Sequence, residues 1–286
     1  MQSLFSIIVV CLNPGEKLRK TLESIVKQKF QDYEVIIKDG GSTDGSLECI
    51  DEVFSKEQFG HGGKQPEVLL VQERDSGIYD AMNQASAKAK GRYVYFLNCG
   101  DLFYDENVLL EMSEFISGSS AYMASQPGIY YGNILERLTG QQVASNPRID
   151  AFGCYRNVPC HQACFYSREL LNLHPFETKY KVRADYEQFL WCFFEGPLGK
   201  KVAFEYKDML IADYEGGGFS ETKENRKRSA KEHKEITGKY MTGGQLLGYR
   251  LILLLTLAPV RTWLSENEKT AGFYNMLKER IYSARH

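Results

Sequence analysis

The segment EVIIKDGGSTDGS, residues 34–46, joins a short apolar run to a loop of small and acidic residues. The β-branched side chains of residues 34–38 are typical of a buried strand, and the glycine, serine and aspartate that follow are typical of a turn. A similar apolar run occupies residues 4–10, and between the two runs apolar side chains recur at helical spacing over residues 18–26. This order of strand, helix and strand predicts a βαβ unit and therefore a parallel sheet.

The same alternation continues towards residue 101. It predicts helices over residues 47–54 and 78–89 and strands over residues 68–71 and 93–97. The second half is less regular, with predicted strands at 129–131, 161–166, 202–205 and 209–212 and one helix at 184–194. From Glu221 onward the composition is helical. The fold class is thus α/β, a mostly parallel sheet flanked by helices, with a mixed α+β second half and a C-terminal helical extension.

Composition excludes several classes of protein. The chain has 286 residues and a net charge of -2, so no overall positive field favours nucleic acid. Seven cysteines at irregular spacing fit a reducing compartment better than a disulfide framework, which predicts a cytoplasmic protein. The N-terminus MQSLFSIIVV lacks a basic region before its apolar run, so we expect a first strand there rather than a signal peptide.

Polar loops follow four of the predicted strands. They are Cys11–Asn13, Asp39–Gly45, Glu73–Gly77 and Asn98–Asp101. In open α/β sheets ligands bind beyond the carboxyl ends of the strands, so these loops predict a binding site. An alternative for Ser42–Asp44 is that these residues only cap the next helix. A GxGxxG fingerprint and a GK[ST] motif are both missing from these loops, which disfavours nicotinamide dehydrogenases and P-loop enzymes.

Five segments together resemble the inverting family-2 glycosyltransferases of the GT-A fold, nucleotide-sugar enzymes of bacterial polysaccharide synthesis. The segments are SIIVVCLN, EVIIKDGGSTDGS, ERDSGIYDAMNQASAKAKGRYVYFLNCGD, HQACFY and ADYE, which cover roughly residues 4–220. The resemblance implies a GT-A catalytic domain over residues 1–220. Its first part, 1–101, would bind the nucleotide sugar and its second part, 102–220, would face the acceptor. Residues 221–286 would form the helical extension.

The resemblance also implies a set of site residues. Asp39 would accept a hydrogen bond from the base of the donor, a UDP-sugar by preference, and Asp101 would bind a divalent cation, Mg²⁺ or Mn²⁺. Asp185 matches the position of the family's catalytic base. The other donor-side residues would be Asn13, Asp75, Gly77, Asn83 and Asn98, and the acceptor side would hold His161, Gln162 and Glu187.

Two departures from the family pattern change the expectations. Asn98 and Gly100 stand where many relatives carry aspartate, so we expect the metal to bind only together with the donor diphosphate. Leu12 replaces a tyrosine that would stack on the base, so the identity of the donor nucleotide is not determined by the resemblance. Because the acidic motif retains only one aspartate, an alternative function is a degenerate transferase domain that binds nucleotide or glycan without turnover.

The proposed chemistry needs an ionised base beside the acceptor hydroxyl. An aspartate with a pKa near its reference value of about 3.9 is ionised at neutral pH and can take that proton. The alternative for Asp185 is a solvated acid on a helix whose apolar face is Phe189, Leu190 and Phe193. A sugar-nucleotide pyrophosphorylase would need a glycine- and lysine-rich loop near the N-terminus, and residues 13–17 fit that poorly.

Three other segments have two interpretations each. Cys154, Cys160, His161 and Cys164 suggest zinc but lack the paired C-x2-C spacing. The glycine-rich loop 216–220 and the basic residues 226–228 would close over a diphosphate or form a solvated helix. Residues 246–264 are too short an apolar run to span a bilayer and predict either a helix buried against the catalytic domain or a homodimer partner, or a peripheral contact with the inner membrane face. That contact would suit a lipid-linked acceptor, whereas a glycan acceptor would not need it.

Overall fold

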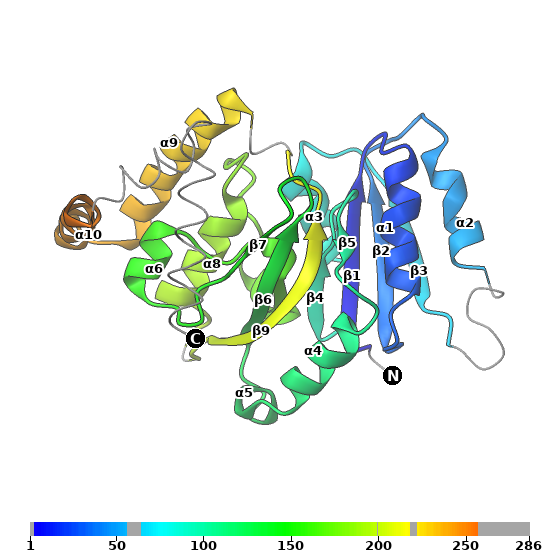
Figure 1. Ribbon diagram of the computed structural model, residues 1–286, viewed down its shortest axis with the longest axis horizontal. Coiled ribbons are helices and arrows are strands. Elements are labelled where there is room, and N and C mark those ends of the chain that lie inside the picture. Colours follow the sequence, from blue (N-terminus) through cyan, green and yellow to red (C-terminus); the bar gives the residue numbers. More distant parts are fainter. Residues whose placement is uncertain (1–2, 56–63, 199, 218–221, 257–286) are drawn as a thin grey trace. The chain divides into compact units, whose positions relative to one another are not determined.

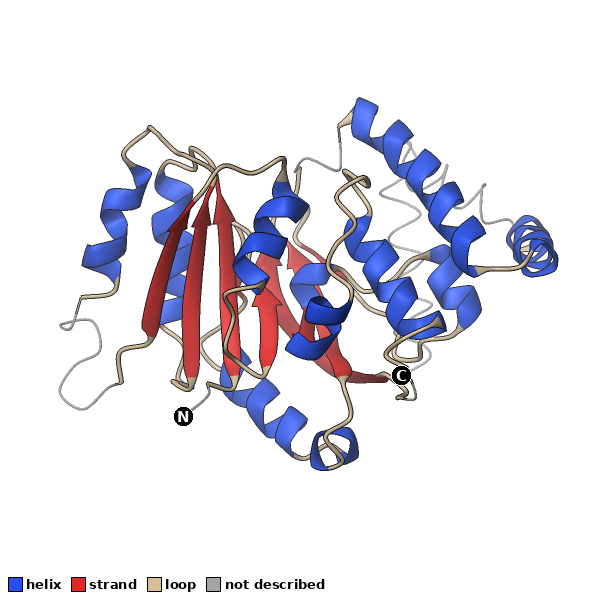
Figure 2. Ribbon diagram, turned by 180° about the vertical axis from the view of Figure 1, so that it is seen from behind, coloured by secondary structure: helices blue, strands red, loops and turns tan. Residues whose placement is uncertain are grey.

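The computed structural model describes residues 3–55, 64–198, 200–217 and 222–256. Those before residue 237 form one curled sheet with helices on both faces (Figures 1 and 2). The strands are β1 Phe5–Cys11, β2 Tyr33–Asp39, β3 Glu67–Gln72, β4 Tyr93–Phe96, β5 Leu102–Phe103, β6 Gly128–Glu136, β7 Gln141–Val143, β8 Cys164–Ser167 and β9 Ala203–Tyr214. The α-helices are α1 Glu16–Val26, α2 Cys49–Val53, α3 Ile78–Ser86, α4 Val108–Ser117, α5 Ser120–Met123, α6 Ala151–Arg156, α7 Arg168–Leu173, α8 Ala184–Phe194, α9 Lys223–Tyr240 and α10 Gly243–Leu255. Two single turns of 3-10 helix are η1 Ser46–Glu48 and η3 His161–Ala163.

The first half of the sheet is parallel, as the sequence predicts. The strand order is β3-β2-β1-β4-β8-β6-β9-β5, with β7 paired to β6. Strand β2 pairs in parallel with β1 and β3, and the register sets Asp39 beside both Cys11 and Gln72. Because these strands run in the same direction, the loops that follow them lie at one edge of the sheet.

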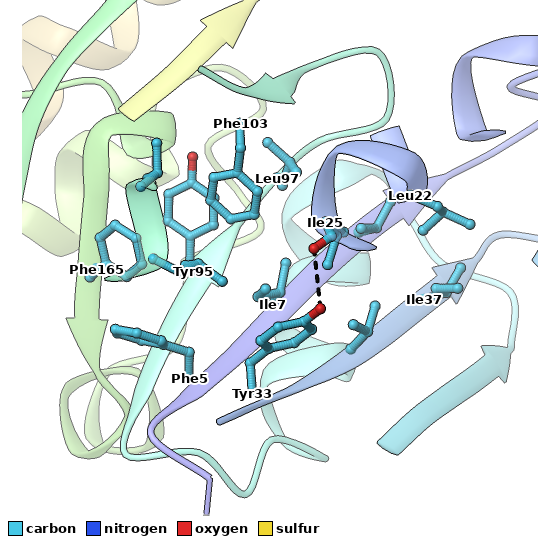
Figure 3. Close-up of a cluster of buried hydrophobic side chains, with 14 of the residues drawn as sticks. Phe5, Ile7, Leu22, Ile25, Tyr33, Ile37, Tyr95, Leu97, Phe103 and Phe165 are labelled. Atoms are coloured by element: carbon cyan, nitrogen blue, oxygen red, sulfur yellow. Dashed lines mark hydrogen bonds between the residues drawn. The ribbon is translucent and has the colours of Figure 1, made fainter. Parts of the chain in front are cut away.

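One face of this sheet packs on α1 and α4. Phe5 and Ile7 of β1, Tyr33 of β2 and Ile25 of α1 belong to the same buried cluster (Figure 3). The Tyr33 hydroxyl donates a hydrogen bond of 3.1 Å to the carbonyl oxygen of Ile25, which satisfies the one polar atom that this ring carries into the core. Both faces of β1 and β2 are buried, which accounts for the apolar runs Ile7–Val10 and Val35–Ile37 within them.

The second half is mixed, and here several details of the sequence prediction are wrong. The two strands predicted at 202–205 and 209–212 are one long strand, β9, which continues past a β-bulge opposite β6. The bulge absorbs the polar residues between the two apolar runs. Residues 161–163 form a 3-10 turn rather than the start of a strand, because the Ala163 N–H bonds back to the carbonyl of Cys160 at 2.8 Å.

The chain divides into two compact units, residues 1–236 and 237–286. The predicted domain boundary at residue 220 stays a prediction, since α9 begins at Lys223 within the first unit. Helix α10 belongs to the second unit, and the predicted burial of residues 246–264 against the catalytic domain stays a prediction. Among the described helices none combines the length and the apolar character needed to cross a membrane. Residues 257–264 of the predicted membrane-contacting segment lie outside the described residues.

Candidate active site

The loop after β2 is organised by the side chain of Asp39. Its carboxylate accepts hydrogen bonds from the N–H groups of Gly41 and Ser42 at 3.0–3.1 Å and from the Ser42 hydroxyl. Asp39 is completely buried. The predicted hydrogen bond that Asp39 would accept from a base stays a prediction, since a carboxylate has about four acceptor positions and three loop donors point at it. Asp39 fixes the backbone of Gly41 and Ser42.

Asn13 joins the ends of β1 and β2. Its φ of +46° places it in the left-handed region, which asparagine tolerates better than most residues. Its N–H donates to the Ser42 hydroxyl at 2.7 Å, and its side-chain oxygen accepts from the Thr43 N–H at 2.9 Å. Asn13 and the neighbouring Leu12, which is 61% exposed, thus form an open surface beside the Asp39 loop.

Asp75 takes part in an ion pair that the sequence analysis did not identify. Lys38 of β2 is completely buried, and its Nζ lies 2.9 Å from Asp75 Oδ2. The same ammonium donates to the carbonyl oxygens of Asp39 and Glu73. Gly77, with a φ of +133°, follows and donates its N–H to Asp75 Oδ1. Asp75 therefore links β2 to the start of α3.

A cavity of about 290 Å³ lies at this carboxyl edge of the sheet, beyond β4. It brings together five of the residues that the resemblance singled out: Asn98, Asp101, His161, Gln162 and Asp185. Its other lining residues are Ile78, Tyr79, Cys99, Cys160, Lys181, Val182, Tyr214, Glu215 and Gly216.

Within this cavity Asp185 is held from two sides. His161 Nδ1 lies 3.3 Å from Asp185 Oδ2, and the Tyr79 hydroxyl lies 2.8 Å from Oδ1. The second nitrogen of His161, Nε2, faces Asn98 Nδ2 at 2.9 Å. Because an amide Nδ2 only donates, Nε2 is the acceptor and Nδ1 carries the proton that points at Asp185. The side chain of Asp185 remains 22% exposed, so a substrate can reach it.

The surroundings of Asp185 favour its ionised form. Burial pushes its pKa up, but the interaction with His161 and the hydrogen bond of Tyr79 outweigh burial, and the pKa lies below the ordinary value of aspartate. Burial, with the nearby Asp185 charge, raises the pKa of the Tyr79 phenol well above its usual value. At neutral pH the pair is thus a carboxylate beside a neutral phenol.

Asp101 lies deeper in the same cavity and is only 3% exposed. Its Oδ1 accepts the N–H of Glu215 at 2.9 Å, and its Oδ2 accepts from Gln162 Nε2 at 3.1 Å. Burial raises the pKa of Asp101, and these two hydrogen bonds only partly oppose it. A carboxylate in this position gains from any cation that enters the cavity.

Like Asn13, Asp39, Asp75 and Gly77, the predicted site residues Glu187 and Asn83 do not line this cavity. Glu187 is completely buried and bonds to His174 Nε2 at 2.9 Å. Residues two apart on a helix lie on nearly opposite sides, so α8 turns Glu187 away from the cavity that Asp185 faces. Asn83 exchanges two hydrogen bonds of 2.8–2.9 Å with the backbone of Phe176 and anchors α3. Their predicted contacts with substrate therefore have no support from the geometry.

Two further clusters contain residue types that bind metals. Burial raises the pKa of Cys154 and of Cys160 to about 12, so both are neutral thiols rather than thiolate ligands. Across the described residues, the side chains of His174, Glu177 and Glu187 are the group of three or more His, Cys, Asp or Glu residues close enough to share an ion. Within this cluster Glu187 is already bonded to His174.

The family model for glycosyl transferase family 2 matches residues 6–172, which include the loops and most of the cavity described above. This chain belongs to glycosyltransferase family 2. A PGL/p-HBAD biosynthesis glycosyltransferase of Mycobacterium tuberculosis is 31% identical over 263 residues, 91% of each chain. Glycosyltransferase GlyG of Streptococcus pneumoniae is 30% identical over 147 residues, 49% of this chain and 46% of GlyG.

Solved structures of GT-A glycosyltransferases share the fold. S. aureus TarS 1-349, in complex with UDP-GlcNAc, superposes with a TM-score of 0.56 and 17% identity, covering 84% of this chain and 68% of TarS 1-349. The mannosyltransferase PcManGT of Pyrobaculum calidifontis, in complex with GDP-Man and Mn²⁺, has a TM-score of 0.56 and 15% identity and covers 99% and 86%. The family-2 assignment and the α/β fold predicted from the sequence are thus confirmed.

Proposed function

We propose that this family-2 glycosyltransferase moves a sugar, with inversion, from a nucleoside diphosphate to a hydroxyl of a glycan or lipid-linked acceptor. The observation that carries the proposal is that Asp101 and Asp185 line one cavity at the carboxyl edge of the sheet. Complexes of structural neighbours with UDP-GlcNAc and with GDP-Man support a nucleotide-sugar donor, and UDP is the first nucleotide to test. The relatives named for PGL/p-HBAD biosynthesis make a glycolipid acceptor worth testing.

The residues present fit a hard divalent cation. Asp101 offers carboxylate oxygens, and the Oδ1 of Asn98 is buried with no hydrogen-bond partner. Both are oxygen ligands of the kind that Mg²⁺ and Mn²⁺ prefer, and PcManGT was solved with Mn²⁺. A bound cation would stabilise the charge that builds up on the departing diphosphate. In this proposal Asn13 and the Asp39 loop shape the donor side, as the sequence suggests, whereas Gly77 lines the second cavity.

Asp185 is the base of the proposed reaction. Its carboxylate, held by Tyr79 and His161, takes the proton of the acceptor hydroxyl as that oxygen attacks the sugar carbon. The carbon–oxygen bond to the diphosphate breaks on the opposite side, so the configuration inverts. Gln162 keeps Asp101 in place for the donor, while His161 serves the base.

A second cavity of about 410 Å³ provides room for the acceptor. It shares Ile78, Tyr79 and Lys181 with the first cavity. It is lined in addition by Ser76, Gly77, Asp80, Thr178, Tyr180 and Arg228. Because Tyr79 contacts Asp185, an acceptor in this second cavity reaches the proposed base along the Tyr79 ring.

The function is tested by thermal unfolding of the chain with a panel of nucleotide sugars, with and without Mn²⁺, followed by measurement of donor consumption. A donor at 100 times its Kd stabilises the native state by about 2.7 kcal/mol, so at least one sugar nucleotide should raise Tm clearly. The absence of any stabilisation would refute nucleotide-sugar binding. Stabilisation without consumption of donor, with glycan and glycolipid acceptors supplied, would favour the alternative of a binding domain without turnover.

Replacing His161 by Ala should move the acidic limb of the kcat/KM profile to higher pH. Asp185 acts when ionised, so activity is present above its pKa and is lost as pH falls through it. His161 lowers that pKa against the effect of burial, and its removal lets the pKa rise. The profile between pH 4 and 9 measures the shift. His174→Ala is the control, since His174 bonds to Glu187 outside the cavity and should leave the limb in place.

A further inference from the structure

Gly100 leaves a space that the side chain of Glu215 fills. Gly100 is buried, with a φ of +105°, and a Cβ added to it would lie 2.5 Å from Glu215 Oε2. That separation is well below van der Waals contact, so an aspartate at position 100 and the present position of Glu215 exclude each other. The carboxylate that the acidic motif lacks at residue 100 is thus supplied at nearly the same place from the end of β9.

Glu215 is also tied directly to Asp101. Its N–H donates to Asp101 Oδ1 at 2.9 Å, and both residues line the same cavity. The buried Oδ1 of Asn98, which has no hydrogen-bond partner, belongs to this cavity as well. Asp101, Glu215 and Asn98 therefore offer three hard oxygen donors from two separate parts of the chain.

Lys17 neutralises Glu215 when no cation is present. Its Nζ lies 2.8 Å from Glu215 Oε1, and the two side chains are 56% and 38% exposed. Exposed ion pairs of this kind contribute only about 0–1 kcal/mol, so Glu215 can leave Lys17 at small cost. A lysine ammonium cannot follow the carboxylate into a divalent site without opposing the ion, so Lys17 and the cation compete for the same carboxylate.

We propose that Glu215 is a ligand of the divalent cation together with Asp101, in place of a carboxylate at residue 100. The inference rests on the proposed metal-assisted function and adds a residue that the sequence motif does not contain. It explains how a chain with a single aspartate left in the motif keeps enough negative charge for the cation. It also assigns a role to the loop after β9, whose first residue carries the ligand.

Binding of Mn²⁺ in the presence of UDP tests this inference. It is measured by electron paramagnetic resonance as the loss of the signal of free Mn²⁺. Glu215→Gln should weaken binding at least about tenfold, the lower end of what is lost even for residues just outside a metal's ligand sphere. Lys17→Met should instead strengthen binding by up to about fivefold, since the competing ion pair is removed. The matched control is Glu52→Gln, an exposed carboxylate paired with Arg19 far from the cavity, which should change nothing.

The possible results separate this inference from the function on which it rests. If wild type and Asp101→Asn bind Mn²⁺ with UDP equally weakly, the metal-assisted function itself fails. If Asp101→Asn loses Mn²⁺ while Glu215→Gln binds it like wild type, the metal site stands and Glu215 is not a ligand. Equal weakening by Glu215→Gln and Lys17→Met would also overturn the inference, because Glu215 would then act through its ion pair. Circular dichroism of each variant confirms that it is folded.

Discussion

Replacing Asp185 by Asn is expected to lower kcat for sugar transfer by about 10²- to 10⁴-fold, the usual contribution of a general base. Asparagine has nearly the same shape, and its side-chain oxygen can still accept from Tyr79, so the cavity should keep its form. What is lost is the group that takes the acceptor proton. The variant should bind the donor about as tightly as wild type does. The rise in Tm on adding nucleotide sugar and Mn²⁺ measures this binding.

Glu187→Gln is the matched control for this prediction. Glu187 is two residues further along α8, is completely buried and contacts His174 rather than the cavity. Its replacement should leave kcat near the wild-type value. If Asp185→Asn turns over its substrates like wild type, another residue is the base. If instead Glu187→Gln is the variant that loses kcat, the assignment of the two acids is reversed.

The two acids also show what the sequence could predict. A helix over residues 184–194 was predictable from its apolar spacing, and from that helix it follows that residues 185 and 187 cannot face the same cavity. The prediction of both as site residues came from the resemblance alone. A helix over Val108–Ser117 was likewise available from the spacing of Val108, Leu109, Met112 and Ile116, although it was not predicted.

Contacts between distant segments could not be predicted in this way. Glu215 meets Asp101 across 114 residues, and the space it occupies exists only because residue 100 has no side chain. The resemblance assigns Asp39 to the base of the donor, but it does not predict the hydrogen bonds that the following loop donates to the same carboxylate. The resemblance of the motifs correctly places the loops at the carboxyl edge of the sheet. The hydrogen-bond and ion-pair partners of each side chain depend on packing that one sequence does not reveal.

The buried ion pair of Lys38 could have been predicted from the sequence. The run EVIIKD places a lysine inside a strand that is buried on both faces, and a buried ammonium requires a partner. The partner is Asp75, with the carbonyls of Asp39 and Glu73 completing the site. One side chain therefore holds the end of β2 to the loop that leads into α3.

Lys38→Met should accordingly lower the free energy of unfolding by about 3–5 kcal/mol, the cost of removing one member of a buried ion pair. Methionine fills most of the space but leaves Asp75, only 14% exposed, without its cation. Urea unfolding followed by circular dichroism gives the value. Lys90→Met is the control, because Lys90 and Glu67 form an exposed pair near the same strands, and it should cost at most about 1 kcal/mol.

The double variant Lys38→Met, Asp75→Asn distinguishes the sources of that loss. If most of it comes from the unpaired carboxylate, removing the charge of Asp75 should recover part of the stability, and a double variant no more stable than Lys38→Met would assign the loss to the two carbonyls. The bonds from Lys38 to the carbonyls of Asp39 and Glu73 also hold the loop that follows Asp39. The double variant lacks these bonds, so it should bind UDP more weakly than wild type even if its free energy of unfolding is restored. A Lys38→Met variant that loses less than about 1 kcal/mol would show that the buried pair contributes no more than a surface one.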